Sequence, residues 1–282
     1  MNDKKYCVIT FLFNGEPFQI TLIFYSIRKE NFMNLNKLDI FIGTHKTFEP
    51  KVSNDCYKIV VGNHKIENDS NLELIQCGNK DDVLDDRFYS EIYMLRWVAK
   101  NYPLKEYVGF CHNRKYFSFM DDVPNVEEVL KENDAILGRP FKRESSNMRE
   151  FYKICHNIED LNIIENIIDE KFKEYSKGMR EFLYGKMMFP YNMFIMKRED
   201  FLEYINFIGS VLDEYVKIVG TDIVKRIEDN KEKYLKNFYP NDTIEYQYRI
   251  GGYLAERLTT VFALTKFKKI ATCGITITEQ KY

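Results

Sequence analysis

Short apolar runs alternate with amphipathic segments through much of the chain. Apolar runs of strand length occur at residues 39–43, 57–61, 107–111, 134–138 and 189–196. Segments with a 3.6-residue apolar period occur at 87–100, from Asn157 onward and at 198–215, and shorter or more charged helices are predicted at 125–131 and 221–237. Because strands and helices alternate, we predict an α/β fold with helices flanking a sheet.

The predicted helix over 87–100 leads directly into the 107–111 run. Asp85 or Asp86 would cap this helix, and Pro103 ends it. A later helix, over 245–264, contains Gly251-Gly252. A glycine pair weakens a helix interior, so we expect a kink, a break or a close approach of backbone to a ligand there.

The first residues predict a β-hairpin. Runs at 6–13 and 18–25 flank Asn14-Gly15, a favoured hairpin turn, although a β-α start to the sheet is the competing interpretation. We expect residues 1–37 to be a β-rich extension joined to the sheet and 38–282 to be a single domain. Residues 269–278 alternate like an edge strand.

Composition narrows the class of protein. With 282 residues, 45 % of them apolar, and 22 Phe and 20 Tyr, the chain can bury a large core. Its 41 basic and 43 acidic side chains nearly balance, which disfavours sequence-independent nucleic-acid binding. Six scattered cysteines suggest buried free thiols in a reducing cytoplasm. No apolar run approaches the roughly 18 residues of a membrane span. We expect a cytoplasmic protein whose membrane contact, if any, is peripheral at the inner face of the plasma membrane.

Polar side chains follow two of the predicted strands at once. Thr44, His45 and Lys46 follow 39–43, and His112 to Lys115 (His-Asn-Arg-Lys) follow 107–111. In open α/β sheets, ligands bind outside the carboxyl ends of the strands. These imidazole, amide and cationic groups predict a site for an anion, most simply a diphosphate. An ordinary solvated loop with a satisfied histidine is the alternative.

Other candidate groups are more isolated. Asn192 interrupts the 189–196 run, so its amide needs a partner, either backbone or water, or a ligand hydroxyl. Residues 141–150 are polar and predict a mobile loop over the site. The sequence has no Asp-x-Asp, no phosphate-binding glycine loop, no G-x-S-x-G and no H-x-x-x-H pair. Carboxylates for Mg²⁺ or Mn²⁺ are therefore absent from the strand ends, and zinc is disfavoured.

Four blocks of the chain carry a resemblance to a known family. They are Thr44-His45-Lys46, the Tyr89-Ser90-Glu91 to Trp97-Val98-Ala99-Lys100-Asn101 segment, Tyr107 to Phe117 (YVGFCHNRKYF), and Tyr191 to Lys197 taken with Tyr248-Arg249 and Gly252 to Leu258. In this order the blocks resemble a family of bacterial capsular and exopolysaccharide-biosynthesis glycosyltransferases of GT-A type. The resemblance covers about residues 38–264. Asn113 and Lys115 stand where the family usually has Tyr and Arg.

The resemblance implies a GT-A-like (Rossmann-like) mixed sheet with a helical C-terminal portion. It implies transfer of a sugar from a nucleotide diphosphate, with a UDP-sugar as the first choice, to a glycan or lipid-linked glycan. The residues expected to bind the donor are Thr44, His45, Lys46, Glu91, His112, Asn113, Arg114, Lys115, Asn192, Arg249 and Arg257. A need for Mn²⁺ or Mg²⁺ is left open, because the missing Asp-x-Asp suggests that cationic side chains replace the metal.

The general base is the least determined assignment. A base that deprotonates an acceptor hydroxyl must be a carboxylate or a histidine within hydrogen-bond reach. Glu256, Asp134 and His112 are candidates that the sequence does not rank. Two rival functions also remain: transfer of a non-sugar substituent to the same glycan, and a nucleotide-sugar-binding subunit without catalytic activity.

Overall fold

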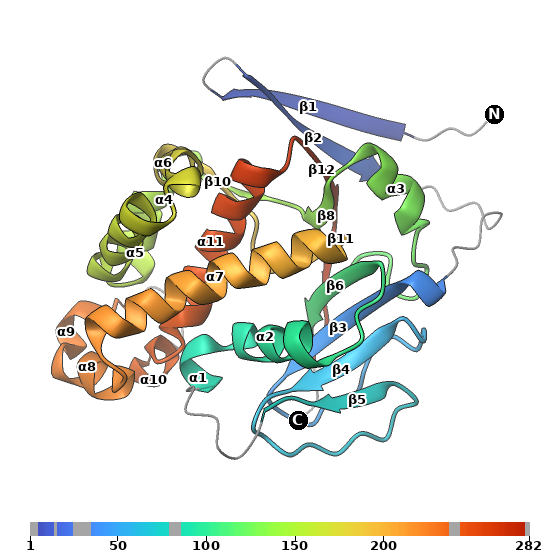
Figure 1. Ribbon diagram of the computed structural model, residues 1–282, viewed down its shortest axis with the longest axis horizontal. Helices are drawn as coiled ribbons and strands as arrows, with labels where there is room; N and C mark the ends of the chain where they lie inside the picture. Colours follow the sequence, from blue (N-terminus) through green and yellow to red (C-terminus); the bar gives the residue numbers. More distant parts are fainter. Residues whose placement is uncertain (1–4, 14–15, 25–34, 79–85, 237–242, 280–282) are drawn as a thin grey trace.

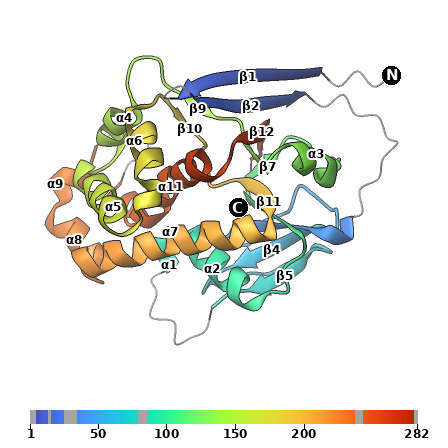
Figure 2. The same cartoon turned by 45° about the horizontal axis from the view of Figure 1, so that its top comes forward.

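The computed structural model describes residues 5–13, 16–24, 35–78, 86–236 and 243–279. Asn14-Gly15, Asp85 and most of the connection at 26–37 lie outside these ranges, so the predictions made for them are not considered further. The one described part of that connection, Leu35–Lys37, is a short 3-10 helix. Figures 1 and 2 show a twisted sheet with long helices packed against one of its faces and a cluster of shorter helices at one end.

The main sheet of the described residues has 11 strands. Along its main path the order is β1 (Lys5–Phe13), β2 (Glu16–Phe24), β12 (Lys269–Cys273), β8 (Ala135–Gly138), β11 (Phe194–Lys197), β6 (Tyr107–His112), β3 (Leu38–Thr44), β4 (Tyr57–Val61) and β5 (Glu73–Gln76). Two short strands, β7 (Lys115–Phe117) and β13 (Ile275–Ile277), pair with each other beside β6. A separate pair consists of β9 (Phe141–Lys142) and β10 (Met187–Met188).

The sheet is mixed, as expected. β3, β4, β5 and β6 are parallel, and so are β2, β12 and β8, whereas β11 runs antiparallel to both β6 and β8. The carboxyl ends of β3, β6 and β8 therefore lie next to the amino end of β11. We call this line of strand ends the sheet edge, as distinct from an outermost (edge) strand. Chain segments that approach this edge from four strands can contribute side chains to one site.

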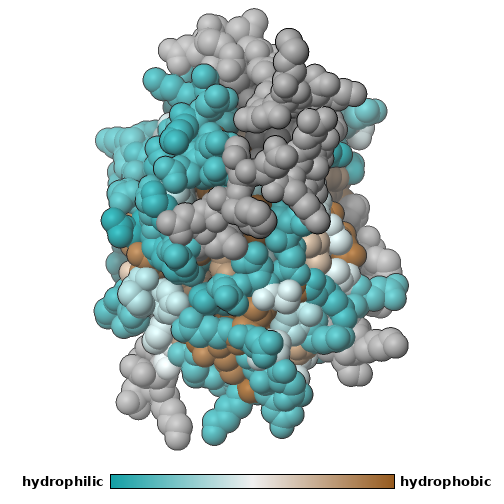
Figure 3. Space-filling model, turned by 90° about the vertical axis from the view of Figure 1, so that its right-hand side faces the viewer, coloured by the Kyte–Doolittle hydropathy of each residue, from teal (hydrophilic) through white to brown (hydrophobic). Residues whose placement is uncertain are grey.

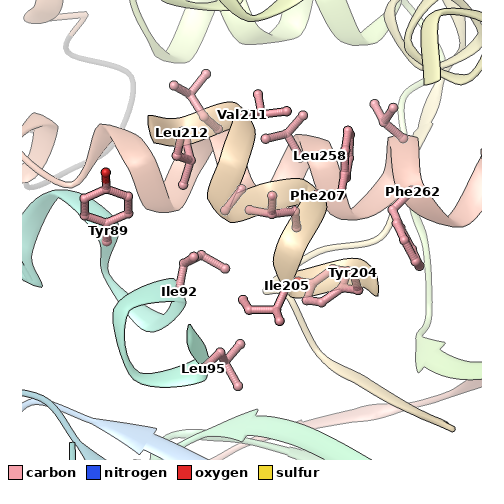
Figure 4. Packing of buried hydrophobic residues seen from close by; sticks show 14 of the residues in the cluster. Tyr89, Ile92, Leu95, Tyr204, Ile205, Phe207, Val211, Leu212, Leu258 and Phe262 are labelled. Carbon is pink, nitrogen blue, oxygen red and sulfur yellow. The ribbon is translucent and has the colours of Figure 1, made fainter. Parts of the chain in front are cut away.

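The core lies on both faces of the sheet because successive strand residues point in opposite directions. Along β6, Val108 and Phe110 join one buried cluster and Tyr107 and Cys111 the other. The first cluster includes the apolar faces of α2 (Glu91–Asn101), α7 (Arg198–Val219) and α11 (Ile250–Lys266). Figure 4 shows α7 between the other two helices, with Phe207 and Leu258 among the side chains in contact.

The remaining helices complete the two faces. α3 (Val126–Glu132) packs on the second cluster. Near the far end of α7 lie α4 (Met148–Cys155), α5 (Ile158–Lys171), η2 (Lys173–Tyr175), α6 (Ser176–Tyr184), α8 (Ile223–Asp229), α9 (Lys231–Tyr234) and α10 (Ile244–Gln247). Asn157 caps α5 as predicted, accepting a hydrogen bond from the Glu159 backbone N–H at 3.2 Å.

A buried ion pair ties these helices together. Asp160 of α5, which is fully buried, accepts from Arg226 of α8 at 2.8 Å and from the Tyr215 hydroxyl at 2.7 Å. The Tyr234 hydroxyl lies 3.3 Å from the same carboxylate. Burial raises the pKa of Asp160 even against the attraction of Arg226. We call Asp160, Tyr215, Arg226 and Tyr234 the helical ion-pair cluster.

Three predicted helices are each divided in two. The 87–100 helix is interrupted at Ser90, which separates α1 (Asp86–Tyr89) from α2; the 221–237 helix is interrupted at Asn230; and the 245–264 helix is interrupted at Tyr248-Arg249. The break at Ser90 has φ 49° and ψ −130°, a conformation that a periodicity argument cannot detect.

The glycine pair lies just after the third break, in the first turn of α11. A Cβ added to Gly251 would lie 2.4 Å from the Phe88 carbonyl oxygen, and one added to Gly252 would lie 2.9 Å from Ser90 Oγ. The pair is therefore needed for close packing of α11 against the α1–α2 break. We expected a kink, a break or an approach of backbone to a ligand; the structure has a break just before the pair, and the groups that approach both glycines closely are protein.

Three local predictions need correction. Residues 269–278 do not form one edge strand: β12 lies between β2 and β8, because the N-terminal hairpin pairs outside it, whereas β13, among the described strands, pairs with β7 alone and is an edge strand. The 141–150 segment is not only a loop, since it contains β9 and the start of α4. The 189–196 run becomes a strand only from Phe194, because Tyr191 and Asn192 are left-handed (φ 69° and 52°).

Candidate functional site

A cavity of about 780 Å³ opens at the sheet edge described above. Its walls come from the ends of β3 and β6, from the β6–β7 turn, from α2 and α11, and from the segments around β9, α4 and α10. Its volume is in the range of pockets that hold a ligand of nucleotide size. The face of the molecule seen in Figure 3 is mostly hydrophilic in its described part, with apolar areas among the polar side chains.

The β6–β7 turn presents its polar side chains to this cavity. His112, Asn113, Arg114 and Lys115 all line it. His112 donates from Nε2 to the Tyr191 carbonyl oxygen at 2.5 Å, and Asn113 donates from Nδ2 to Thr44 Oγ1 at 3.2 Å. Lys115 Nζ lies 4.1 Å from the centroid of the Tyr191 ring. These contacts hold the turn against β3 and the segment before β11.

Positive charge predominates in the cavity. Six lysine and arginine side chains line it against two glutamates, although the whole chain carries a formal charge of −2. Within the described residues, Arg114, Lys115, Arg143 and Arg249 form no ion pair with a carboxylate within 4.0 Å. Unpaired cations in a concave site repel one another and are stabilised when an anion binds.

Glu91 is the acidic residue at the centre of this arrangement. The break at Ser90 places it in the first turn of α2, where it is only 7 % exposed. Its Oε1 accepts from Asn192 Nδ2 at 2.5 Å, and Asn192 Oδ1 accepts from the Thr259 hydroxyl at 2.6 Å. The Tyr204 hydroxyl lies 2.9 Å from Thr259 Oγ1. A buried chain of hydrogen bonds thus fixes the orientation of Glu91.

Glu256 is held differently. Its Oε1 accepts from the Tyr191 backbone N–H at 2.8 Å, and its Oε2 accepts from Arg257 at 2.8 Å. Arg257, 4 % exposed, also donates to the Tyr253 carbonyl oxygen at 3.1 Å. Both oxygens of Glu256 are thus engaged by protein groups, and it stabilises the left-handed turn at Tyr191.

Burial and neighbouring charges shift the pKa values of the cavity groups. Burial alone would raise the pKa of Glu91, but the nearby Arg249 guanidinium and the Asn192 amide favour the ionised carboxylate and lower its pKa. Burial lowers the pKa of His112, despite the opposing effect of Glu91, and leaves the imidazole neutral. Burial also lowers the pKa of Lys115, an effect opposed by Glu256 and reinforced by Arg114.

Most of the predicted site residues line the cavity. They are His45, Lys46, Glu91, His112, Asn113, Arg114, Lys115, Arg249, Glu256 and Arg257. Thr44 lies just behind it, where its hydroxyl donates to the Lys46 carbonyl oxygen at 2.7 Å. Asn192 is also behind the wall, fully buried, and its amide is engaged by Glu91 and Thr259 rather than open to a ligand hydroxyl.

Asp134 does not belong to the site. It precedes β8, at the opposite edge of the sheet, and its Oδ2 accepts from the backbone N–H groups of Lys268 and Lys269 at 2.7 and 2.9 Å. The direction of β8 could not be read from its sequence. This position removes Asp134 from the candidates for a general base.

Sequence reasoning missed part of the cavity wall. Arg143 and His156 line it, as do four aromatic side chains, Phe141, Phe151, Tyr246 and Tyr253. The expectation of a segment over the site at 141–150 pointed to Phe141 and Arg143. For His156 the sequence favoured only a structural role beside a helix cap.

The described residues offer few ligands for a divalent metal. They contain no group of three or more His, Cys, Asp or Glu side chains that could hold an ion. The two cavity carboxylates are engaged by Asn192 in one case and by Tyr191 and Arg257 in the other. Mg²⁺ and Mn²⁺ prefer several oxygen ligands, and among the described residues the cavity offers only these two carboxylates.

The mixed sheet with its flanking helices is a GT-A-like fold. A solved structure titled WbbM bifunctional glycosyltransferase matches with a TM-score of 0.64 at 19 % sequence identity, over 88 % of this chain and 46 % of that one. This chain therefore spans less than half of that protein. At this identity, the likeness supports the fold alone.

The chain belongs to the family described as Domain of unknown function (DUF4422), whose model matches residues 39–267. Two fungal structures also align. The mannosyltransferase Ktr4p from S. cerevisiae does so with a TM-score of 0.39 and 11 % identity, over 91 % of this chain and 76 % of that one. Core-mannan synthase A from Aspergillus fumigatus, in a Mn/GDP form, has a TM-score of 0.36 and 10 % identity, over 98 % and 88 %. No curated protein sequence matches significantly.

None of the described helices is long and apolar enough to cross a membrane.

Proposed function

We propose that this protein is a glycosyltransferase that moves a sugar from a nucleotide diphosphate, a UDP-sugar in the first instance, to a hydroxyl of a capsular or exopolysaccharide glycan. The observation that carries the proposal is the set of unpaired cations at the sheet edge. Arg114, Lys115 and Arg249 line one cavity and have no carboxylate partner among the described residues. The GT-A-like fold and the motif resemblance support the same reaction class.

In the proposed reaction, an acceptor hydroxyl oxygen forms a bond to the anomeric carbon while the bond from that carbon to the diphosphate oxygen breaks. The bonding electrons leave with the nucleoside diphosphate. Arg114 and Lys115 would stabilise this developing negative charge by charge-assisted hydrogen bonds. Each bond of this kind contributes about 1.5–3 kcal/mol.

The acidic groups have a complementary role. Glu91, ionised and fixed by Asn192, would face the sugar rather than the diphosphate, because its charge would repel phosphate oxygens. The acceptor proton needs a base within hydrogen-bond reach, and His112 and Glu256 remain the candidates among the predicted residues. Neutral His112 keeps a lone pair on Nδ1 because Nε2 donates to Tyr191.

A thermal-shift screen of UDP-, GDP-, CMP- and dTDP-sugars, each with EDTA or with Mn²⁺, tests this proposal. A ligand that binds only the native state raises its stability. We expect at least one donor to raise the unfolding temperature in EDTA, and that donor then to give a glycosylated product. A shift that appears only with Mn²⁺ would overturn the replacement of the metal by cationic side chains. Donor binding without product from any acceptor would favour a subunit without catalytic activity. Product formed from a non-sugar donor would favour transfer of a non-sugar substituent to the glycan.

Cytoplasmic localisation, with peripheral contact to membrane-bound acceptors, is part of the same proposal, because nucleotide sugars and lipid-linked glycans would meet there.

A further inference from the structure

The part of the cavity formed by β9, α4, α10 and α11 differs from the part at the strand ends. We call its lining residues the aromatic wall, defined by Phe141, Arg143, Phe151, His156, Tyr246 and Tyr253. Within this set there is no acidic residue. The proposed diphosphate site uses none of these side chains, so the wall requires its own explanation.

The rings of the wall form two pairs. The Phe141 and Phe151 centroids are 5.4 Å apart, and those of Tyr246 and Tyr253 are 5.3 Å apart. Phe141 is 37 % exposed, so part of its ring surface is open to a ligand. Flat ring faces at the edge of a pocket suit the apolar C–H face of a sugar ring, and they lose little conformational entropy on binding.

His156 adds a hydrogen-bond acceptor to the wall. It is 1 % exposed and stacks on Tyr253 with centroids 4.4 Å apart. Its Nδ1 lies 3.2 Å from Gln247 Oε1, which makes Nδ1 the donor and leaves a lone pair on Nε2. Burial, together with Arg257, lowers the pKa of His156 to about 3, so the ring stays neutral at any working pH. A neutral imidazole in a cavity wall can accept from a sugar hydroxyl.

Arg143 adds an anion-binding group. Its guanidinium carbon lies 4.9 Å from the Phe151 ring centroid, and Nε approaches Ser146 Oγ at 3.5 Å. It forms no ion pair with a described carboxylate, in contrast to Arg257, which is held by Glu256. The stacked guanidinium therefore keeps its two terminal nitrogens for a planar anion such as a carboxylate or a phosphate ester.

We propose that the aromatic wall binds the acceptor, and that this acceptor is an acidic saccharide whose sugar ring packs on the aromatic side chains while its anionic group contacts Arg143. The inference rests on the proposed transferase function, since it assigns the second substrate of the same cavity. The anion can be the carboxylate of an acidic sugar or a phosphate substituent, because a guanidinium recognises both by the same paired hydrogen bonds.

Saturation-transfer NMR on the full chain with saturating UDP tests the proposal. The probes are a methyl glucoside, the corresponding methyl glucuronide and the methyl glucoside 6-phosphate. We expect one or both charged probes to bind about tenfold more tightly than the neutral one, since one charge-assisted pair is gained. The charged probe that binds more tightly identifies the source of the anion. Equal binding of all three probes would overturn the proposal, and this comparison needs no variant.

A variant of Arg143 then tests whether this side chain causes the tighter binding of the charged probes. Arg143→Met keeps an apolar side chain over Phe151 but removes the guanidinium, so the charged and neutral probes should bind about equally. Arg143→Lys keeps the positive charge and should keep part of the preference for the charged probe. The matched control is Arg180→Met, since Arg180 is an exposed arginine of α6 that lies 3.5 Å from Asp169. A preference that survives Arg143→Met would exclude Arg143 as the anion contact and overturn the proposal.

The same samples separate this inference from the proposed function. Thermal shifts with UDP and UDP-sugars report on the diphosphate site. A normal UDP shift without discrimination among saccharides would reject the acidic acceptor alone. No shift with any nucleotide, together with discrimination that depends on Arg143, would reject the transferase proposal and leave a binding site for acidic saccharides.

Discussion

Two arginines in this molecule have opposite surroundings. Arg226 of the helical ion-pair cluster is paired with the buried Asp160 and two tyrosine hydroxyls, whereas Arg114 faces a cavity without a carboxylate partner among the described residues. A satisfied buried pair stabilises one folded arrangement. An unsatisfied cation contributes little to stability and is available to a ligand. We therefore expect Arg226 to stabilise the fold and Arg114 to contribute to the proposed binding of the donor.

Arg226→Gln should produce the largest change. It leaves the Asp160 carboxylate buried without its counter-charge, and breaking a buried pair in this way costs about 3–5 kcal/mol. Urea unfolding at pH 7 measures the loss. Nucleotide-sugar affinity of the folded fraction should stay within about twofold, and a large loss of affinity there would contradict the contrast between Arg226 and Arg114.

Arg114→Gln should lower the affinity for the donor without lowering the stability of the fold. Donor affinity should fall by about 10- to 100-fold, as expected for one lost charge-assisted interaction. The unfolding temperature should be unchanged or higher, because the variant removes repulsion with Lys115. Calorimetry with the donor found by screening gives the affinity. A clear drop in stability together with unchanged affinity would assign Arg114 a structural role.

Asn192→Leu should lower both the stability of the fold and the activity. The ionised Glu91 would lose its amide donor, and leaving a buried charged group without its partner costs about 1–3 kcal/mol. The substitution also strains a left-handed residue, a conformation that asparagine tolerates and leucine does not. Asn192→Gly relieves the strain without restoring the hydrogen bond. A glycine variant as active as the wild type would show that the orientation of Glu91 is not needed.

The dependence of stability on pH offers a smaller effect. His156 is neutral when folded, with a pKa of about 3, but takes up a proton near pH 6.5 when unfolded. The unfolded state therefore binds more protons below that pH, so stability falls as the pH decreases from about 6.5 towards 3. For one group the slope is at most about 1.4 kcal/mol per pH unit. His156→Gln should make the urea midpoint less sensitive to pH between 6.5 and 4, and an unchanged slope would contradict the neutral, buried imidazole.

The smallest expected effect is that of Phe141→Ser on stability. With a side chain 37 % exposed, Phe141 should contribute less than about 1 kcal/mol to folding. Saccharide binding in the NMR assay should nevertheless weaken several-fold, and unchanged binding would remove Phe141 from the acceptor site.

Much of the part of the cavity at the strand ends could be predicted because it depends on local features. Residues that directly follow a buried strand lie at its carboxyl end whatever the rest of the fold, and Lys46, Arg114 and Lys115 were found in this way. The hairpin and the cap at Asn157 are likewise local and were confirmed. Asp134 was misassigned because the edge of the sheet at which it lies depends on the direction of β8, which is a tertiary property.

The aromatic wall was harder to predict for the same reason. His156 and Tyr253 meet because α4 ends beside α11, and nothing in their local sequence encodes that contact. The break at Ser90 was also invisible, since the apolar period continues across it. Glu91 owes its position in the cavity wall to this break and to Gly251-Gly252, which allow α11 to approach.

The β6–β7 turn has a consequence for synthesis of the protein. Its outer strand, β7, pairs with β13, in register from Lys115–Ile277 to Phe117–Ile275, and the Thr278 backbone N–H donates to the Arg114 carbonyl oxygen at 2.9 Å. The ribosome must therefore release about 160 further residues after Arg114 before the strand that braces the turn emerges. At the elongation rates of living cells this interval lasts many seconds. During that time a nascent chain should have most of its helices available for folding but no β7–β13 pairing to brace the turn that lines the cavity.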